Sequence, residues 1–213
     1  MKNENIKSVP LVVIKRLPRY YRYLGELLKQ GVTRISSRDL SEKMGVTASQ
    51  IRQDLNCFGG FGQQGYGYNI EKLHHEIADI LGLNRGYRTI IIGAGNLGHA
   101  LANHSNFEKR GFKLVGIFDS NRDVVGSKIN NLTVCHIDEI ETFFANEGAD
   151  IAILALPKSS VKEVADRLIA LNIKGLWNFS YTELNVPDNV AVENVHLSDS
   201  LMTLSYKLTE LND

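Results

Sequence analysis

The sequence has few cysteines and no long hydrophobic run, and each absence excludes a class of protein. Cys57 and Cys135 are the only cysteines among 213 residues, and no C-x-x-C pair occurs. This argues against a disulfide framework and against a structural zinc site, so we expect no metal. No apolar stretch follows Met1, and no run is long enough to cross a bilayer. We therefore expect a cytoplasmic protein with no membrane contact.

The formal net charge of the whole chain is zero, but basic and acidic residues are unevenly distributed along it. Residues 1–68 contain eleven Lys and Arg against five Asp and Glu, whereas the remainder contains 13 basic and 19 acidic residues. The length allows one or two domains. A basic module attracts phosphate polymers, so the pattern predicts a nucleic-acid-binding module joined to an acidic one.

A glycine motif follows a short apolar run in the acidic part. Residues 90–92 are three isoleucines, typical of a buried parallel strand, and they lead into G-x-G-x-x-G at residues 93–98. The first Gly of this motif permits a tight turn, the second a close approach to a pyrophosphate, and the third close packing of the next helix, here expected over 96–110. The candidate phosphate-binding residues are Gly93, Ala94, Gly95, Asn96, Leu97 and Gly98.

An acidic residue follows the glycine motif at the distance that is typical of dinucleotide-binding folds. The apolar run 113–118 predicts the next strand and ends at Asp119, about 20 residues beyond the glycines, where a carboxylate can bind an adenosine ribose. Ser120 and Asn121 follow, and neither is basic, which favours NAD(H) over NADP(H). The alternative is a strand-to-helix turn of an α/β domain that binds no nucleotide.

Apolar strands and amphipathic helices alternate through the rest of this part and predict a doubly wound parallel sheet. Strands are expected over 132–135, 150–157 and 175–180, with helices over 137–146 and 159–171. Ligands of such sheets lie at the carboxyl ends of the strands. Ala155, Pro157 and Phe179 are the candidate apolar walls around a nicotinamide, where burial would disfavour the oxidised, cationic ring.

The basic part predicts a winged helix-turn-helix. Helices are expected over 18–30, 38–44 and 47–58, and Thr47 with Gln50 forms a capping-box pattern. A glycine-rich stretch over 59–68 suits the hairpin of a wing, or else a flexible linker. An ordinary three-helix bundle with a solvated face is the alternative to DNA binding. The candidate DNA contacts are Arg16, Arg19, Arg22, Thr47, Ser49, Gln50, Arg52, Gln53, Gln63 and Gln64.

Two further helices complete the expected organisation. The apolar spacing over 70–81 predicts a linker helix, and we interpret its His74 and His75 as surface residues. Near the end, leucines at 197, 201, 204, 208 and 211 form a seam on a helix capped by Ser198, which packs against a second copy or against its own domain. The expected domains are residues 1–82 (winged helix with linker helix), 83–196 (Rossmann-like) and 197–213 (dimerisation helix). Cys57, at the end of the third helix, is either oxidisable or a buried, inert thiol.

The combination of motifs resembles the Rex family of redox-sensing transcriptional repressors over nearly the whole chain. The likeness rests on residues 15–21, 51–55, 61–68, 93–98 and 178–179. The resemblance implies a homodimer that binds palindromic operator DNA, is released by NADH, and exchanges its C-terminal helix between subunits. It also implies a redox switch built from a Tyr, an Asp and an Arg, whose positions here are His104, His196 and Arg16. With two histidines there, NADH sensing would depend on pH between about 6 and 7.

An NAD-dependent oxidoreductase with an N-terminal appendage is the rival interpretation. A dehydrogenase needs an acid or base beside the hydride acceptor and a place for its substrate. Only a short helical tail follows the predicted sheet, and His104 and His196 are the only candidates for that acid or base. We therefore expect a regulator and not an enzyme. A structural module that binds a nucleotide or coenzyme A is a third interpretation, which the basic segment disfavours.

Overall fold

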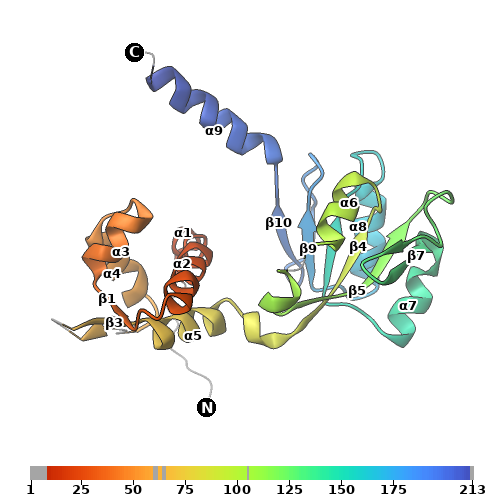
Figure 1. Ribbon diagram of the computed structural model, residues 1–213. Helices are drawn as coiled ribbons and strands as arrows, with labels where there is room; N and C mark the ends of the chain where they lie inside the picture. Colours follow the sequence, from red (N-terminus) through yellow and green to blue (C-terminus); the bar gives the residue numbers. More distant parts are fainter. Residues whose placement is uncertain (1–8, 60–61, 64–65, 105, 212–213) are drawn as a thin grey trace. The chain divides into compact units, whose positions relative to one another are not determined.

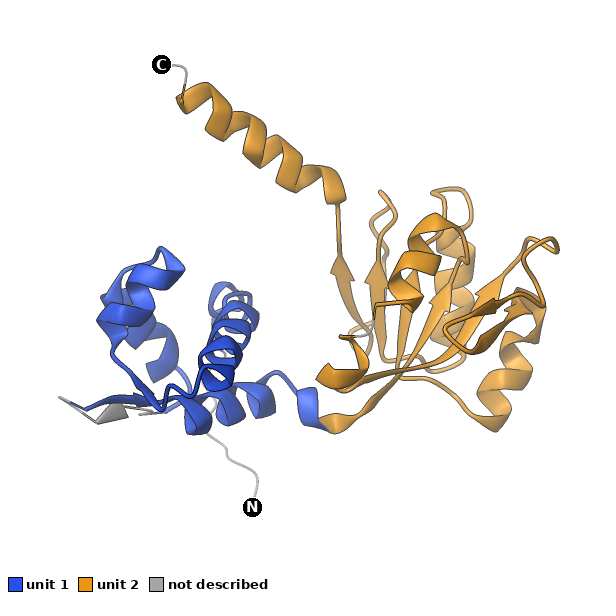
Figure 2. Ribbon diagram, viewed as in Figure 1, with its two compact units in different colours: residues 1–84 blue, residues 85–213 orange. Residues whose placement is uncertain are grey.

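A computed structural model describes residues 9–59, 62–63, 66–104 and 106–211 of the protein. The chain divides into two compact units, residues 1–84 and residues 85–213 (Figure 2). Each unit has a hydrophobic core of its own, centred on α-helices in unit 1 and on a β-sheet in unit 2.

Unit 1 packs helices against a small antiparallel sheet whose strand order is β1-β3-β2. Its core includes Tyr20, Leu24 and Ile51, all fully buried. The elements are α1 (Leu11–Ile14), α2 (Leu17–Lys29), β1 (Arg34–Ile35), α3 (Ser37–Met44), α4 (Ala48–Asn56), β2 (Gly62–Gln63), β3 (Gly67–Asn69) and α5 (Ile70–Ile80).

The helix-turn-helix prediction is confirmed by the caps of α3 and α4. The Ser36 hydroxyl accepts a hydrogen bond from the Asp39 main-chain N–H, and Thr47 accepts one from the Gln50 N–H. Between the helices, Gly45 ends α3 at φ +62°, a left-handed conformation that glycine adopts without strain. After α4, β2 and β3 pair as the expected hairpin of a wing.

The surface position expected for His74 on α5 is wrong. Its ring is half-buried and stacks on Tyr21 of α2, with ring centroids 4.1 Å apart. Gly25 makes room for it, because a Cβ at Gly25 would lie 3.2 Å from His74 Nε2. His75, by contrast, is exposed and lies 3.3 Å from the carboxylate of Asp79.

Unit 2 contains a seven-stranded sheet in the order β10-β9-β8-β4-β5-β7-β6, parallel except for β6. This is the expected doubly wound arrangement. Its elements are β4 (Tyr87–Ile92), α6 (Asn96–Ala102), β5 (Phe112–Asp119), β6 (Lys128–Ile129), β7 (Leu132–His136), α7 (Ile140–Asn146), β8 (Ile151–Leu154), α8 (Val161–Ala170), β9 (Gly175–Asn178), β10 (Ala191–Asn194) and α9 (Leu197–Glu210). Short 3-10 turns lie at Leu83–Arg85, Glu108–Arg110 and Ile137–Glu139.

The two faces of this sheet are covered unequally. Alternate strand residues such as Ile90 and Leu154 share a core with Ile140 of α7 and Leu168 of α8. The intervening residues point to the other face, which carries the short α6 (Figure 1) and the 3-10 turn at Glu108–Arg110. That face is hollowed into a groove of about 1090 Å³.

Three expectations about unit 2 are corrected. The helix after the glycine motif ends at Ala102 and not near residue 110: the next main-chain bond, from the His104 N–H to the Leu101 carbonyl, closes a tighter turn, and the Asn103 side-chain amide caps the end by donating to the His99 carbonyl. Strand β10 was not expected and pairs in parallel with β9. Helix α9 is preceded by His196 as its N-cap, so Ser198 lies inside the helix and does not cap it. Within the described part of the chain, no helix has the length and apolar character that a bilayer crossing requires.

Candidate functional site

The glycine loop between β4 and α6 is tightly packed except at one residue. Gly93 has φ +103°, and a Cβ there would lie 2.4 Å from the Ala155 carbonyl oxygen. A Cβ on Gly98 would lie 1.7 Å from the Gly93 carbonyl oxygen. At Gly95 a Cβ would meet no atom within 4 Å. Two glycines therefore allow the loop to fold, and the third leaves its main chain open to a ligand, which fits a dinucleotide pyrophosphate.

Asp119 is held against this loop at the end of β5. Its Oδ2 accepts a hydrogen bond of 2.6 Å from the Ala94 N–H, and its Oδ1 accepts one of 2.7 Å from the Asn121 N–H. The carboxylate is half-buried and is fixed by two main-chain donors. This is the position from which an acid can bind ribose hydroxyls beside the loop.

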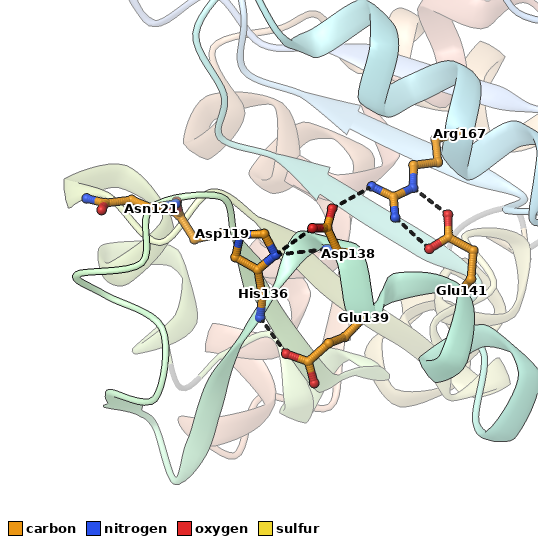
Figure 3. Close-up of polar contacts among 7 residues, drawn as sticks. All are labelled: Asp119, Asn121, His136, Asp138, Glu139, Glu141 and Arg167. Carbon is orange, nitrogen blue, oxygen red and sulfur yellow. Dashed lines mark hydrogen bonds and ion pairs between the residues drawn. The ribbon is translucent and has the colours of Figure 1, made fainter.

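His136 lies at the same edge, and sequence reasoning missed it. It ends β7 and is the register partner of Asp119 (Figure 3). The Glu139 carboxylate accepts a hydrogen bond from the His136 N–H, and the Asp138 N–H donates to His136 Nδ1 at 3.3 Å. His136 could have been found from the sequence, because it ends the predicted strand that follows Asp119 and neighbouring parallel strands end at the same edge of a sheet.

An ion pair behind this edge joins the two helices of the covered face. Arg167 of α8 binds the Glu141 carboxylate of α7 through two guanidinium nitrogens, and Asp138 lies 3.9 Å from a third (Figure 3). Hydrogen bonding to Arg167 holds the pKa of Glu141 below its usual value. The pair fixes α7 beside α8 and so steadies the turn after His136.

The apolar wall residues line the same edge on the other side of the loop. Ala155 contacts Gly93, and the Phe179 N–H donates to the Leu154 carbonyl at 3.1 Å. Phe179 and Ala155 are half-buried, whereas Pro157 is exposed. Because β9, β8, β4 and β5 are neighbouring parallel strands, Phe179, Ala155, the glycine loop and Asp119 follow their carboxyl ends along one edge of the sheet.

Asn178 shapes the turn that carries Phe179. It is fully buried, and its amide nitrogen donates to the Thr182 carbonyl and to Asn194 Oδ1, each at 2.8 Å. Its Oδ1 accepts from the Ser180 N–H and hydroxyl. All of its amide groups are therefore used to tie β9, the following turn and β10 together.

The three predicted switch residues lie in separate contacts. His104 is exposed and packs edge-on against Phe107, with centroids 4.6 Å apart. His196 stacks on Tyr181, and its Nδ1 is buried without a hydrogen-bond partner among the described residues. Arg16 lies in unit 1, where it binds Asp54.

The predicted DNA contacts fall into three groups. Exposed side chains on α4 and α2 are free of the core: Ser49, Arg52, Gln53, Arg19 and Arg22. Arg52 donates to the Ser37 hydroxyl at 3.0 Å. Arg16 and Gln50 instead direct their polar groups to Asp54. Thr47 caps α4, Gln63 lies in β2, and Gln64 lies outside the described residues.

Two family models match the chain. Residues 8–56 match the putative DNA-binding protein N-terminus, and residues 84–182 match the CoA binding domain. The described residues contain no group of three or more His, Cys, Asp or Glu that could hold a metal ion.

Curated relatives cover nearly the full length. A redox-sensing transcriptional repressor Rex of Thermoanaerobacter pseudethanolicus is 61% identical over 203 residues, 95% of this chain and 91% of that protein. A Rex repressor of Clostridium botulinum is 55% identical over 199 residues, 93% of this chain and 95% of the relative. The chain belongs to the Rex family.

Solved structures of a Rex-family repressor agree. RSP in complex with β-NAD+ and operator DNA is 60% identical, with a TM-score of 0.90 and coverage of 96% of this chain and 94% of that chain. RSP in complex with β-NADH is 56% identical, with a TM-score of 0.90 and 97% coverage of both chains. The Rex relatives are named as repressors, which agrees with the expectation of a regulator rather than an enzyme.

Proposed function

We propose that this chain is a homodimeric, cytoplasmic repressor whose unit 1 binds operator DNA and whose unit 2 binds NAD(H), so that NADH releases the DNA. The observation that carries the proposal is the edge of unit 2. There, an open main chain at Gly95, a carboxylate fixed at Asp119 and an apolar turn at Phe179 follow one another. The RSP complexes with NAD+, NADH and operator DNA support the same assignment.

Each part of this edge has a distinct task. The main chain of residues 93–98 would bind the pyrophosphate, and Asp119 the adenosine ribose. Ala155, Pro157 and Phe179 would surround the nicotinamide, which is cationic when oxidised and neutral when reduced. An apolar surrounding disfavours an unpaired cation, so these residues would favour the reduced form. Each 1.4 kcal/mol of such preference is about a tenfold difference in affinity.

Dimerisation would use the C-terminal helix. None of the residues of α9, all of which the structure describes, is buried, and Leu201 is 67% exposed. Unit 2 also carries the apolar groove on its sheet, lined among others by Phe107, Leu114, Ile153 and Trp177. An apolar helix and an apolar groove in one chain suit exchange between two copies, with α9 of one covering the groove of the other.

A reciprocal titration tests the proposal. A duplex that the protein itself selects from a random pool serves as operator, and its binding is followed by fluorescence anisotropy with NADH or NAD+ added. We expect NADH to weaken operator binding and, by linkage, saturating operator to weaken NADH by the same factor. Unchanged NADH affinity on saturating operator would remove the coupling between the units.

The same titration separates the alternatives. Coenzyme A is the competing ligand, because the matching family model is named for it. Binding of coenzyme A with no binding of NAD(H) would overturn the cofactor assignment. Steady consumption of NADH with a small carbonyl or imine substrate would favour an oxidoreductase. Recovery of the protein in the soluble cell fraction is expected for a cytoplasmic repressor.

A further inference from the structure

The buried side of α4 carries the carboxylate of Asp54, and each of its two oxygens accepts two hydrogen bonds. Asp54 is 1% exposed. Its Oδ2 accepts from Arg16 Nε at 2.7 Å and from the Tyr20 hydroxyl at 2.8 Å. Its Oδ1 accepts from Arg16 Nη2 at 2.6 Å and from Gln50 Nε2 at 2.9 Å. Two helices, α2 with the residue before it and α4, are joined by this one group.

Asp54 and Arg16 are charged at neutral pH, whereas Tyr20 and Gln50 are neutral hydrogen-bond donors. Burial by itself would raise the pKa of Asp54, but the hydrogen bonds from Arg16, Tyr20 and Gln50 outweigh it and hold the pKa below its usual value. Burial, and then the bond to Asp54, raise the pKa of Tyr20, so its hydroxyl remains a donor. The guanidinium of Arg16 neutralises the charge of Asp54. It binds both carboxylate oxygens, and this bidentate geometry makes the ion pair directional.

The spacing of the four residues fixes more than a single contact. Arg16 and Tyr20 are four residues apart at the start of α2, and Gln50 and Asp54 are four residues apart on α4, so each pair lies on one helix face. Bonds from one pair to the other set both the rotation of α4 about its axis and its height along α2. Ile51 and Leu55 also anchor α4, but apolar contacts are not directional.

We propose that Asp54 is the positioning residue for DNA reading: through Arg16, Tyr20 and Gln50 it sets where the exposed Arg52 and Gln53 of α4 point. Arg16 and Gln50 then act through α4 and not by contact with DNA. The inference rests on the proposed operator binding. It concerns discrimination between sequences, because contacts with base edges carry the sequence information and contacts with phosphates do not.

The decisive variant replaces the ion pair by an apolar pair, Arg16→Met with Asp54→Leu. Such replacements often leave stability unchanged or raised, because desolvation of the charges is avoided. We expect a folded protein whose thermal midpoint falls by no more than the loss of one buried hydrogen bond, because the Tyr20 hydroxyl loses its acceptor. The ratio of operator affinity to affinity for an unrelated duplex falls at least about tenfold, corresponding to about 1.4 kcal/mol.

The salt dependence of binding to the unrelated duplex tests whether Arg16 contacts phosphate. The slope of log affinity against log salt concentration is negative, and losing one phosphate contact would make it shallower by about one. A positioning role predicts an unchanged slope. A slope that is shallower by about one in the double variant would overturn the role given to Arg16.

A second variant keeps the test decisive if the double variant does not fold. Asp54→Asn retains Arg16 and the side-chain shape but weakens the bonds, and we expect it to lose discrimination while its binding to the unrelated duplex is kept. Tyr20→Phe removes one bond and should give a smaller loss in the same direction. Unchanged discrimination in folded Asp54→Asn overturns the proposal. If the unchanged protein selects no duplex, the proposed function itself fails.

Discussion

In unit 1, helix α4 is held by hydrogen bonds between side chains, whereas in unit 2 the glycine loop is held by the main chain. Asp54 accepts hydrogen bonds from three side chains that come from two helices. Asp119 accepts its bonds from two main-chain N–H groups, and the loop beside it closes only because two glycines lack a Cβ. Side-chain bonds can be rebuilt with other residues, but the close approach of two backbones leaves room for hydrogen alone.

The largest effect is therefore expected from a methyl group in the loop of unit 2. Gly98→Ala places a Cβ 1.7 Å from the Gly93 carbonyl oxygen. We expect unit 2 to lose about 3 kcal/mol or more of stability and to lose NADH binding. Thermal unfolding and NADH quenching of the single tryptophan measure both.

Gly95→Ala is the matched control, since its Cβ meets no atom within 4 Å. It should unfold like the unchanged protein yet bind NADH at least about tenfold more weakly, or about 1.4 kcal/mol. Equal unfolding of the two variants would show that packing does not distinguish these glycines.

The next effect concerns the outer side of α4. Arg52→Ala should weaken operator binding by about 10- to 100-fold, the range for one bidentate contact with a base, and leave NADH affinity unchanged. Competition binding against an unrelated duplex gives the measurement. Ser37→Ala removes only the partner that Arg52 binds in the free protein. If Ser37→Ala weakens binding as much as Arg52→Ala, Arg52 acts as a tether to α3 and not as a reader.

A smaller effect is expected at the acid of unit 2. Asp119→Ala removes the ribose acceptor and the bond to the Ala94 N–H, so NADH and NAD+ should both bind about tenfold more weakly. Operator affinity without cofactor should not change, because the substitution lies in the other unit. Isothermal titration with each cofactor gives the result, and unchanged affinities would remove Asp119 from the site.

The smallest effect is a pH dependence of unit 1. Burial, with a contribution from His75, lowers the pKa of His74 below its usual value. The unfolded chain then binds a proton that the folded chain does not, so stability is full above about pH 6.5 and falls as the pH drops through the lowered pKa. His74→Phe keeps the ring on Tyr21 and should flatten this fall between pH 7 and 5 in denaturant titrations. His75→Gln, at an exposed position, should keep most of this fall, because burial of His74 is the larger cause.

Features encoded by residues close together in the sequence could be predicted, whereas contacts between residues far apart in the sequence could not. The glycine motif, Asp119 and the apolar strands are local patterns, and the structure places the motif and Asp119 at the carboxyl ends of neighbouring strands. The Asp54 cluster joins residues 38 positions apart, and no spacing in the sequence announces it. The half-buried His74 depends on a gap at Gly25 on another helix. The short α6 was misjudged because the chain tightens at His104, whose N–H donates to the Leu101 carbonyl, and the apolar pattern of the sequence does not show this turn.

Asn178 makes the wall at Phe179 depend on a single amide nitrogen. Asn178→Asp would keep almost the same side-chain shape, but the nitrogen that it replaces donates to two oxygens, those of Thr182 and Asn194. A carboxylate oxygen in its place would face both with no hydrogen to offer. The turn that carries Phe179 would open with little change in volume, so the protein would hold the nicotinamide end of its proposed ligand more weakly while keeping the rest of its fold.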